Sequence, residues 1–73
     1  MAWSGGAVIE NENTKIDEGA TYTYVGKASP GTATSAAQWK IFRITNSDTT
    51  IVWADGNDQY DNIWDNRASL SYS

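Results

Sequence analysis

The sequence contains no cysteine and no histidine among its 73 residues, and it has a single proline. Without cysteine no disulfide can cross-link the chain, and without either residue type the usual ligands of structural zinc are missing. The absence of histidine also excludes Ser-His-Asp and Cys-His nucleophilic sites, together with acid–base catalysis by imidazole. We therefore expect a protein that is not an enzyme and that holds no cofactor and no metal.

Basic residues are few as well. The chain has 5 Lys and Arg residues against 9 Asp and Glu residues, so its net charge is -4. Binding to nucleic acid needs clustered positive charge, and an acidic chain is repelled by an anionic membrane surface. The longest apolar run, residues 51–54, is far shorter than the ~20 residues of a spanning helix. We expect neither nucleic acid nor membrane as a partner, because the basic residues are scattered along the chain: Lys15, Lys27, Lys40, Arg43 and Arg67.

Aromatic residues are plentiful in this small chain. It has 4 Trp, 4 Tyr and 1 Phe, which make up 12% of the residues. Disordered chains are typically poor in aromatic residues, so this content indicates a folded domain. The hydrophobic core of so short a chain is nevertheless small, and no disulfide or zinc site reinforces it.

Several segments have the composition of β-strands. Residues 21–28 are rich in β-branched and aromatic residues, and Gly26 within them indicates a bulge or a close approach of the backbone. Pro30-Gly31 fits the centre of a type II turn in the loop 29–37. Residues 38–45 and 49–54 are two further strands, and the short polar link between them predicts an antiparallel hairpin. Alternation over residues 68–72 predicts a closing strand.

The fold predicted from these segments is all-β. We expect a small antiparallel β-sandwich or partly open barrel of about four to six strands. Tyr60, Ile63 and Trp64 are spaced as neighbours on one side of a helix, which predicts a short helical turn near 60–66. Residues 1–20 are weakly patterned and are predicted to form an N-terminal arm ordered by a partner, and residues 21–73 a single β domain. The predicted core comprises Tyr24, Trp39, Ile41, Ile44, Trp53, Ile63, Trp64 and Leu70.

A run of carboxylates follows the predicted hairpin and invites comparison with a calcium loop. The EF-hand pattern fails, because Tyr60 stands where glycine is required and Asn66 where a bidentate Glu is required. The alternative is an irregular calcium site, since Ca²⁺ accepts irregular cages of oxygen ligands. Formation of turns and caps is the favoured interpretation of these Asp residues, and Arg67 is expected to pair with Asp61 or Asp65. No metal site is therefore predicted from the carboxylates Asp55, Asp58, Asp61 and Asp65.

Several short blocks in a fixed order cover about residues 22–72. These blocks are Tyr24-Val25-Gly26-Lys27-Ala28, Pro30-Gly31, Thr34-Ser35-Ala36-Ala37, Trp39-Lys40-Ile41, Arg43-Ile44, Trp53-Ala54-Asp55-Gly56 and Asp61-Asn62-Ile63-Trp64-Asp65-Asn66-Arg67-Ala68-Ser69-Leu70. In their order and spacing the chain resembles a family of short β-rich structural-type proteins encoded by tailed bacteriophages. The resemblance implies a component of the virion, and it brings no catalytic residues with it.

The expected function combines these observations. A small β protein without disulfides or metals can gain stability by burying apolar surface against a partner. We predict a non-enzymatic structural or interaction protein of the virion (a capsid decoration, neck or tail-fibre component) that binds other virion proteins or copies of itself as a homo-oligomer. The alternative is a carbohydrate-binding module for host adsorption, in which exposed tryptophans stack on sugar rings. The candidate interface residues are Trp3, which stands beside Gly5-Gly6 with no evident partner in its own chain, and Val8, Ile9 and Ile16.

Overall fold

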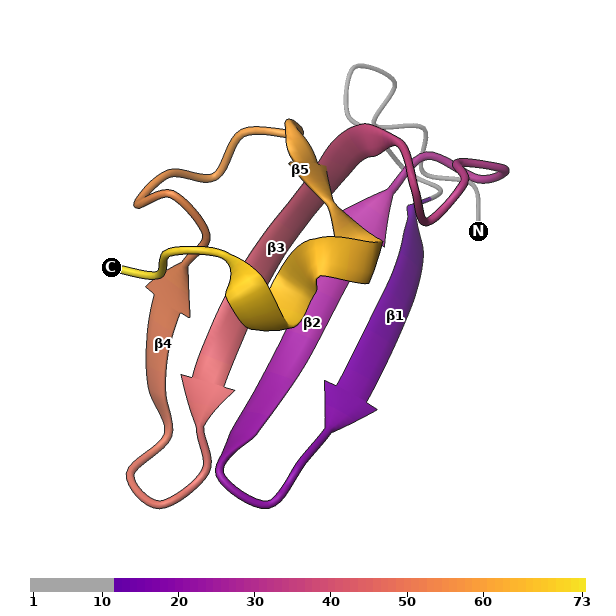
Figure 1. The fold of residues 1–73 in the computed structure, drawn as a ribbon. Coiled ribbons are helices and arrows are strands. Elements are labelled where there is room, and N and C mark those ends of the chain that lie inside the picture. The colour runs from indigo at the N-terminus through magenta and orange to yellow at the C-terminus, as the bar shows by residue number, and fades with distance from the viewer. Residues whose placement is uncertain (1–11) are drawn as a thin grey trace, which may run out of the picture.

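The computed structural model describes residues 12–73, and these residues form an antiparallel sheet in which the first four strands pair in their order along the chain. A short further strand pairs with the beginning of the third strand, and a 3-10 helix follows it (Figure 1). The all-β fold predicted from the sequence is confirmed. The elements are β1 (Asn13–Glu18), β2 (Tyr22–Ala28), β3 (Ala37–Thr45), β4 (Thr50–Trp53), β5 (Asn62–Ile63) and η1 (Trp64–Ser69).

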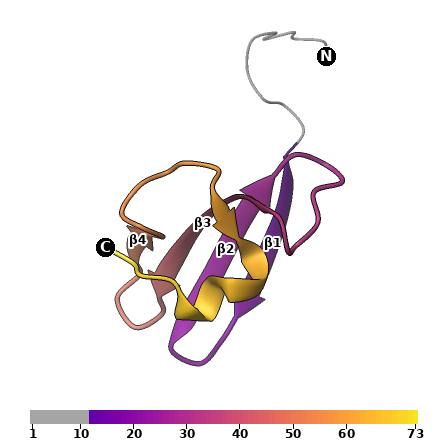
Figure 2. The same cartoon turned by 45° about the horizontal axis from the view of Figure 1, so that its top comes forward.

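The sheet is open, and its two faces differ. η1 lies across one face, and the C-terminal residues return to β4, where Ala54 bridges Tyr72 and the Asp55 N–H donates to the Ser71 carbonyl at 2.7 Å. Figures 1 and 2 show this cover from two directions. It takes the place that a second sheet occupies in a sandwich. Within residues 12–73 no helix or strand packs on the other face.

The turns follow local chemistry. The Thr32 N–H donates to the Ser29 carbonyl at 3.2 Å, and Gly31 has a φ of 88°. A positive φ is accessible to glycine at little cost, so the predicted Pro30-Gly31 turn is confirmed. The predicted hairpin is confirmed too, since β3 and β4 pair in register from Phe42↔Trp53 to Thr45↔Thr50.

The core lies between the sheet and η1. Trp39 is 2% exposed, its ring centroid lies 5.9 Å from that of Trp64, and its indole N–H donates to the Ala33 carbonyl at 2.9 Å. Gly26 makes this stack possible, because a Cβ at that position would lie 2.5 Å from a ring carbon of Trp64. The close approach predicted at Gly26 is therefore present. The buried cluster comprises Ala28, Trp39, Ile41, Ala54 and Trp64, with Tyr24, Leu70 and Tyr72 packed against it.

Three residues predicted for the core lie outside this cluster. Ile44 and Trp53 are only partly buried and belong to the opposite face of the sheet, and Ile63 is partly buried in β5. The reason is the two-residue period of a strand. Ile41 points toward η1, so Ile44 points the other way, and Trp53 shares its side through the hairpin register.

The helical turn begins later than predicted. Ile63 is extended, with φ -101° and ψ 120°, and pairs with Ala37, so the helix starts only at Trp64. Tyr60 consequently does not share a helix side with Trp64 and is exposed. The closing strand predicted over 68–72 is reduced to one bridge at Tyr72, because η1 continues to Ser69.

The predicted boundary between arm and domain at residue 20 also needs correction. β1 pairs with β2 along its whole length, from Asn13↔Ala28 to Glu18↔Thr23, so residues 13–18 are part of the sheet. The polar composition of residues 13–18 does not predict a strand, because an edge strand pairs on one side only and needs little apolar surface. The candidate interface residues Trp3, Val8 and Ile9 lie outside the described residues.

Candidate functional site

The face of the sheet opposite η1 carries a row of apolar side chains that crosses all four long strands. Ile16 pairs with Val25, Val25 with Phe42, and Phe42 with Trp53. Ile44 and Ile51 pair with each other in the next row of the same face. We call this surface the open face, and it comprises Thr14, Ile16, Glu18, Thr23, Val25, Lys27, Lys40, Phe42, Ile44, Ile51 and Trp53.

The apolar part of the open face is ordered by its own contacts. The Phe42 and Trp53 rings meet edge to face with centroids 5.1 Å apart. Val25, in the middle of the row, is only 8% exposed, whereas Ile16 and Ile51 at the sides are 63% and 53% exposed. A contiguous apolar patch on a small protein marks a surface for interaction.

The charged residues of the open face are separated by sign. Lys27 and Lys40 are direct cross-strand partners beyond one side of the apolar row, and Glu18 lies beyond its other side, opposite Thr23. The Lys40 ammonium is 6.0 Å from the Trp53 ring centroid and 5.0 Å from that of Tyr60. At the lysine end Tyr60 also donates its hydroxyl to the Glu12 carboxylate. The face therefore has a positive end and a negative end.

The structure brings one predicted interface residue, Ile16, onto the open face. Neither Phe42 nor Ile51 is predicted from the sequence as a surface residue, and Val25 is not predicted as the buried residue beside Phe42. The available signal was in residues 41–44, where apolar side chains occupy both alternating sets and so indicate a strand with two apolar faces. Among the described tryptophans, Trp39 and Trp64 are buried and Trp53 is partly exposed.

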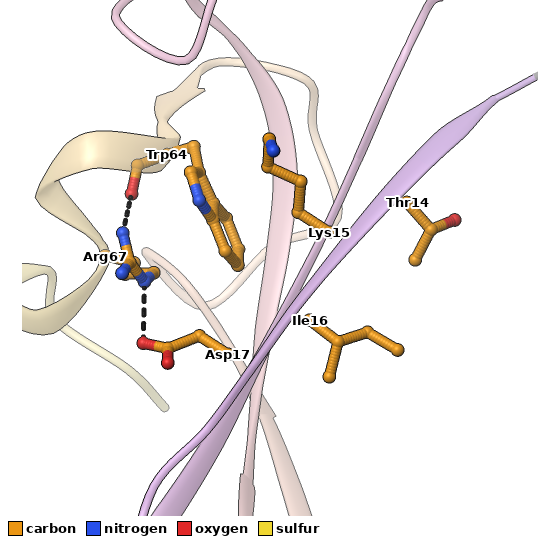
Figure 3. A pocket seen from close by; sticks show the side chains of 6 residues that line it. All are labelled: Thr14, Lys15, Ile16, Asp17, Trp64 and Arg67. Atoms are coloured by element: carbon orange, nitrogen blue, oxygen red, sulfur yellow. Dashed lines mark hydrogen bonds and ion pairs between the residues drawn. The ribbon is translucent and has the colours of Figure 1, made fainter.

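A second site lies on the covered side, where a hollow of about 410 Å³ separates β1 from η1. Figure 3 shows Lys15 and Asp17 projecting from β1 toward Trp64, while Thr14 and Ile16 point away. The Arg67 Nε donates to the Asp17 carboxylate at 3.0 Å, and its guanidinium lies 4.6 Å from the Trp64 ring centroid.

The pairing of Arg67 differs from the prediction. Its partner is Asp17, 50 positions away, and not Asp61 or Asp65, because η1 crosses the sheet and directs the side chain toward β1. Both side chains are partly exposed, so the ion pair contributes at most about 1 kcal/mol. The charges at the hollow thus serve to hold η1 to the edge of the sheet.

The carboxylates after β4 do not converge in the structure. Among residues 12–73, no group of three or more Asp or Glu side chains is placed to hold a metal ion. Asp55 has a φ of 58° and Gly56 a φ of 71°, which is the geometry of a tight turn. Asp and Gly adopt positive φ angles more readily than most residues, which explains why they occupy these two positions.

An arginine is enclosed by aromatic rings on the covered face. The Arg43 guanidinium lies 4.1 Å from the Tyr22 ring centroid and 4.7 Å from that of Tyr72. Tyr72 also donates its hydroxyl to the Arg67 carbonyl at 2.8 Å. Burial raises the pKa of Tyr72 to about 12, and the nearby Tyr24 hydroxyl adds to the effect.

This pKa predicts alkaline destabilisation. Ionisation of Tyr72 is harder in the folded protein than in the unfolded chain, where the pKa is about 10. Its contribution to stability is therefore complete below pH ~10 and is lost as the pH rises through about 12. Between those values the free energy of unfolding should fall by about 1 kcal/mol more in the parent than in Tyr72→Phe, since solvent screens a partly exposed group. Urea unfolding followed by circular dichroism across this range measures the difference.

Tyr60→Phe is the matched control for this prediction. The hydrogen bond to Glu12 raises the pKa of Tyr60 as well, but its ring is exposed and makes no core contact. If the free energy of unfolding falls equally at alkaline pH in the parent and in Tyr72→Phe, another group is responsible.

A scan against protein-family models, a search of curated proteins and a search of solved structures each find no match to this chain. Within residues 12–73, no helix has both the length and the apolar character needed to cross a bilayer. Function is therefore inferred from the geometry of the open face.

Proposed function

We propose that this chain is a non-enzymatic structural protein that assembles with other protein chains through the open face of its sheet. The observation that carries the proposal is the contrast between the two faces. η1 and the C-terminal residues cover one face, and the other presents a continuous apolar surface with no element of residues 12–73 packed on it. The apolar surface comprises Ile16, Val25, Phe42, Ile44, Ile51 and Trp53.

The exposed area supports an energetic argument. Complete burial of an isoleucine side chain contributes roughly 1.5–3 kcal/mol. Ile16 and Ile51 each keep more than half of their surface in water, so most of that contribution becomes available only when a partner covers them. A domain without disulfides gains stability directly from such binding.

The proposed setting is the virion of a tailed bacteriophage. The support for this is the resemblance in residues 22–72, together with a composition that lacks histidine and cysteine chemistry. In that setting the chain serves as a capsid decoration, neck or tail-fibre component, and covering the open face is its mechanism of attachment.

Incorporation into particles tests this function. Virions of the phage that encodes the chain are purified by density gradient, and the chain is quantified by mass spectrometry. We expect the parent in the particles and at least a tenfold loss for Ile51→Asp, because a carboxylate in the apolar surface must be desolvated on binding.

Ala68→Asp is the matched control, since it adds the same charge at an exposed position of η1, on the other side of the sheet. Absence of the parent chain from particles would contradict the virion role. Parental incorporation of Ile51→Asp would contradict the role of the open face.

Carbohydrate binding is the second candidate function, and one observation favours it. Trp53 is partly exposed beside Phe42 on the open face, where its ring is available for stacking. In this case Trp53→Ala abolishes binding of host polysaccharide measured by calorimetry, whereas Ala68→Asp leaves it unchanged. Absence of binding by the parent removes this candidate.

A further inference from the structure

The cross-strand pair Lys27↔Lys40 is unfavourable within a single chain. Like charges directly opposite one another in a sheet repel, and among residues 12–73 neither lysine forms an ion pair. The Trp53 and Tyr60 rings near Lys40, and the Glu12 carboxylate that accepts from the Tyr60 hydroxyl, offer partial compensation. The lysine end of the open face therefore favours a partner that presents a carboxylate there.

We propose that this partner is a second copy of the chain, packed open face to open face about a two-fold axis perpendicular to the strands. This inference rests on the proposed function of the open face and names its occupant. The carboxylate is supplied by Glu18, which projects beyond the opposite side of the apolar row.

The distribution of charge selects the axis. A two-fold axis parallel to the strands would place the lysine ends of the two sheets against each other, with Lys27 facing Lys40 of the second copy. An axis perpendicular to the strands reverses the strand direction across the interface. Each lysine end then meets the end that carries Glu18, which gives two equivalent sets of opposite charges.

The same axis superposes the central apolar row of the two copies. It places Ile44 over Lys40 of the second copy, and Glu18 over Thr14, one strand away from Lys27 of the second copy. With the axis along the row Ile16–Val25–Phe42–Trp53, each of these residues faces its own counterpart, and β1 lies over β1 and β4 over β4. Two twisted sheets pack in this way at about 30° to each other and about 10 Å apart. The pair completes the sandwich that a single chain leaves open.

The edges of the sheet are less suited to self-association. The β4 edge is already bonded to the C-terminal residues, as the Ser73 N–H donates to the Trp53 carbonyl at 3.1 Å. The β1 edge carries Lys15, Asp17 and Glu18, and charged side chains on an edge strand oppose pairing with another chain. The open face is the larger apolar surface.

Sedimentation equilibrium of the full chain tests the inference. We expect a dimer in the parent and at least a hundredfold weaker association for Ile16→Asp, because Ile16 lies on the axis and the variant brings two carboxylates face to face. Lys27→Glu and Glu18→Lys should each weaken association about tenfold, and combining them should return it to within about threefold of the parent, because the exchange restores opposite charges across the axis. Lys15→Glu is the control, since this residue points to the other side of β1. Circular dichroism at low concentration verifies that each variant is folded.

A parent that remains monomeric at about 1 mM overturns the second copy as partner. If Ile51→Asp still loses incorporation into virions, the proposed function survives and the occupant is a different protein. A dimer that tolerates Ile16→Asp, combined with normal incorporation of Ile51→Asp into virions, overturns both. The last outcome is a parent that is monomeric and does not bind the apolar dye ANS, with a double variant Val8→Asp, Ile9→Asp that does bind it. This result assigns the open face to the chain's own N-terminal residues and also overturns the inference.

Discussion

Replacing Trp39 by alanine is expected to lower the free energy of unfolding by about 3–5 kcal/mol. The side chain is 2% exposed, stacks on Trp64 and donates its indole N–H to the Ala33 carbonyl. Truncation removes these contacts and leaves a cavity between sheet and helix that Trp64 alone cannot fill. A domain of this size has a total stability of about 4–11 kcal/mol, so the variant should lose a large fraction of it.

Urea unfolding followed by tryptophan fluorescence and far-ultraviolet circular dichroism measures this effect. Trp53→Ala is the matched control, because it makes the same chemical change on the open face, where the ring is partly exposed. We expect a loss of about 1–2 kcal/mol for Trp53→Ala, in proportion to its smaller buried area. Similar losses in the two variants would mean that the core does not centre on Trp39.

Gly26→Ala is expected to destabilise the protein by about 1–3 kcal/mol through overpacking. The added methyl carbon would lie 2.5 Å and 2.7 Å from two ring carbons of Trp64 and 3.2 Å from a ring carbon of Trp39. Alanine reduces the entropy of the unfolded chain, which offsets roughly 0.4–1 kcal/mol of this loss. The clash exceeds the offset because both indole rings are held in the core.

A double-mutant cycle isolates the clash. In a Trp64→Leu background the ring that the methyl group meets is gone, so the effect of Gly26→Ala on the free energy of unfolding should shrink by at least half. Near-ultraviolet circular dichroism should also report a changed Trp39–Trp64 arrangement in Gly26→Ala alone. An unchanged effect of Gly26→Ala in the Trp64→Leu background would place its cause elsewhere.

The elements predicted best are those whose signals are local. The Pro30-Gly31 turn depends on the φ preferences of two adjacent residues, and the hairpin between β3 and β4 depends on two β-rich runs joined by a short polar link. The start of η1 depends on more than spacing. Ile63 pairs with Ala37 in the sheet, and that tertiary contact delays the helix by several residues.

The candidate site was predicted only in part. Ile16 is predicted as an interface residue, whereas Phe42 is not, although apolar residues in both alternating sets of 41–44 indicate a two-sided strand. The sequence could not show that these residues form one surface, since Ile16, Phe42 and Trp53 come from three strands and meet only through the register. The same holds for the ion pair of Arg67 with Asp17.

Composition and local pattern by themselves determined that the chain has no disulfide and no cysteine or histidine ligand, that it folds as β-structure, and where its main turns lie. Only the tertiary structure decided which face each apolar residue occupies and that η1 covers one face alone. The physical reason is that turn and strand preferences act between chain neighbours. The assignment of faces depends instead on strand register and on where the Trp39–Trp64 stack fits over Gly26.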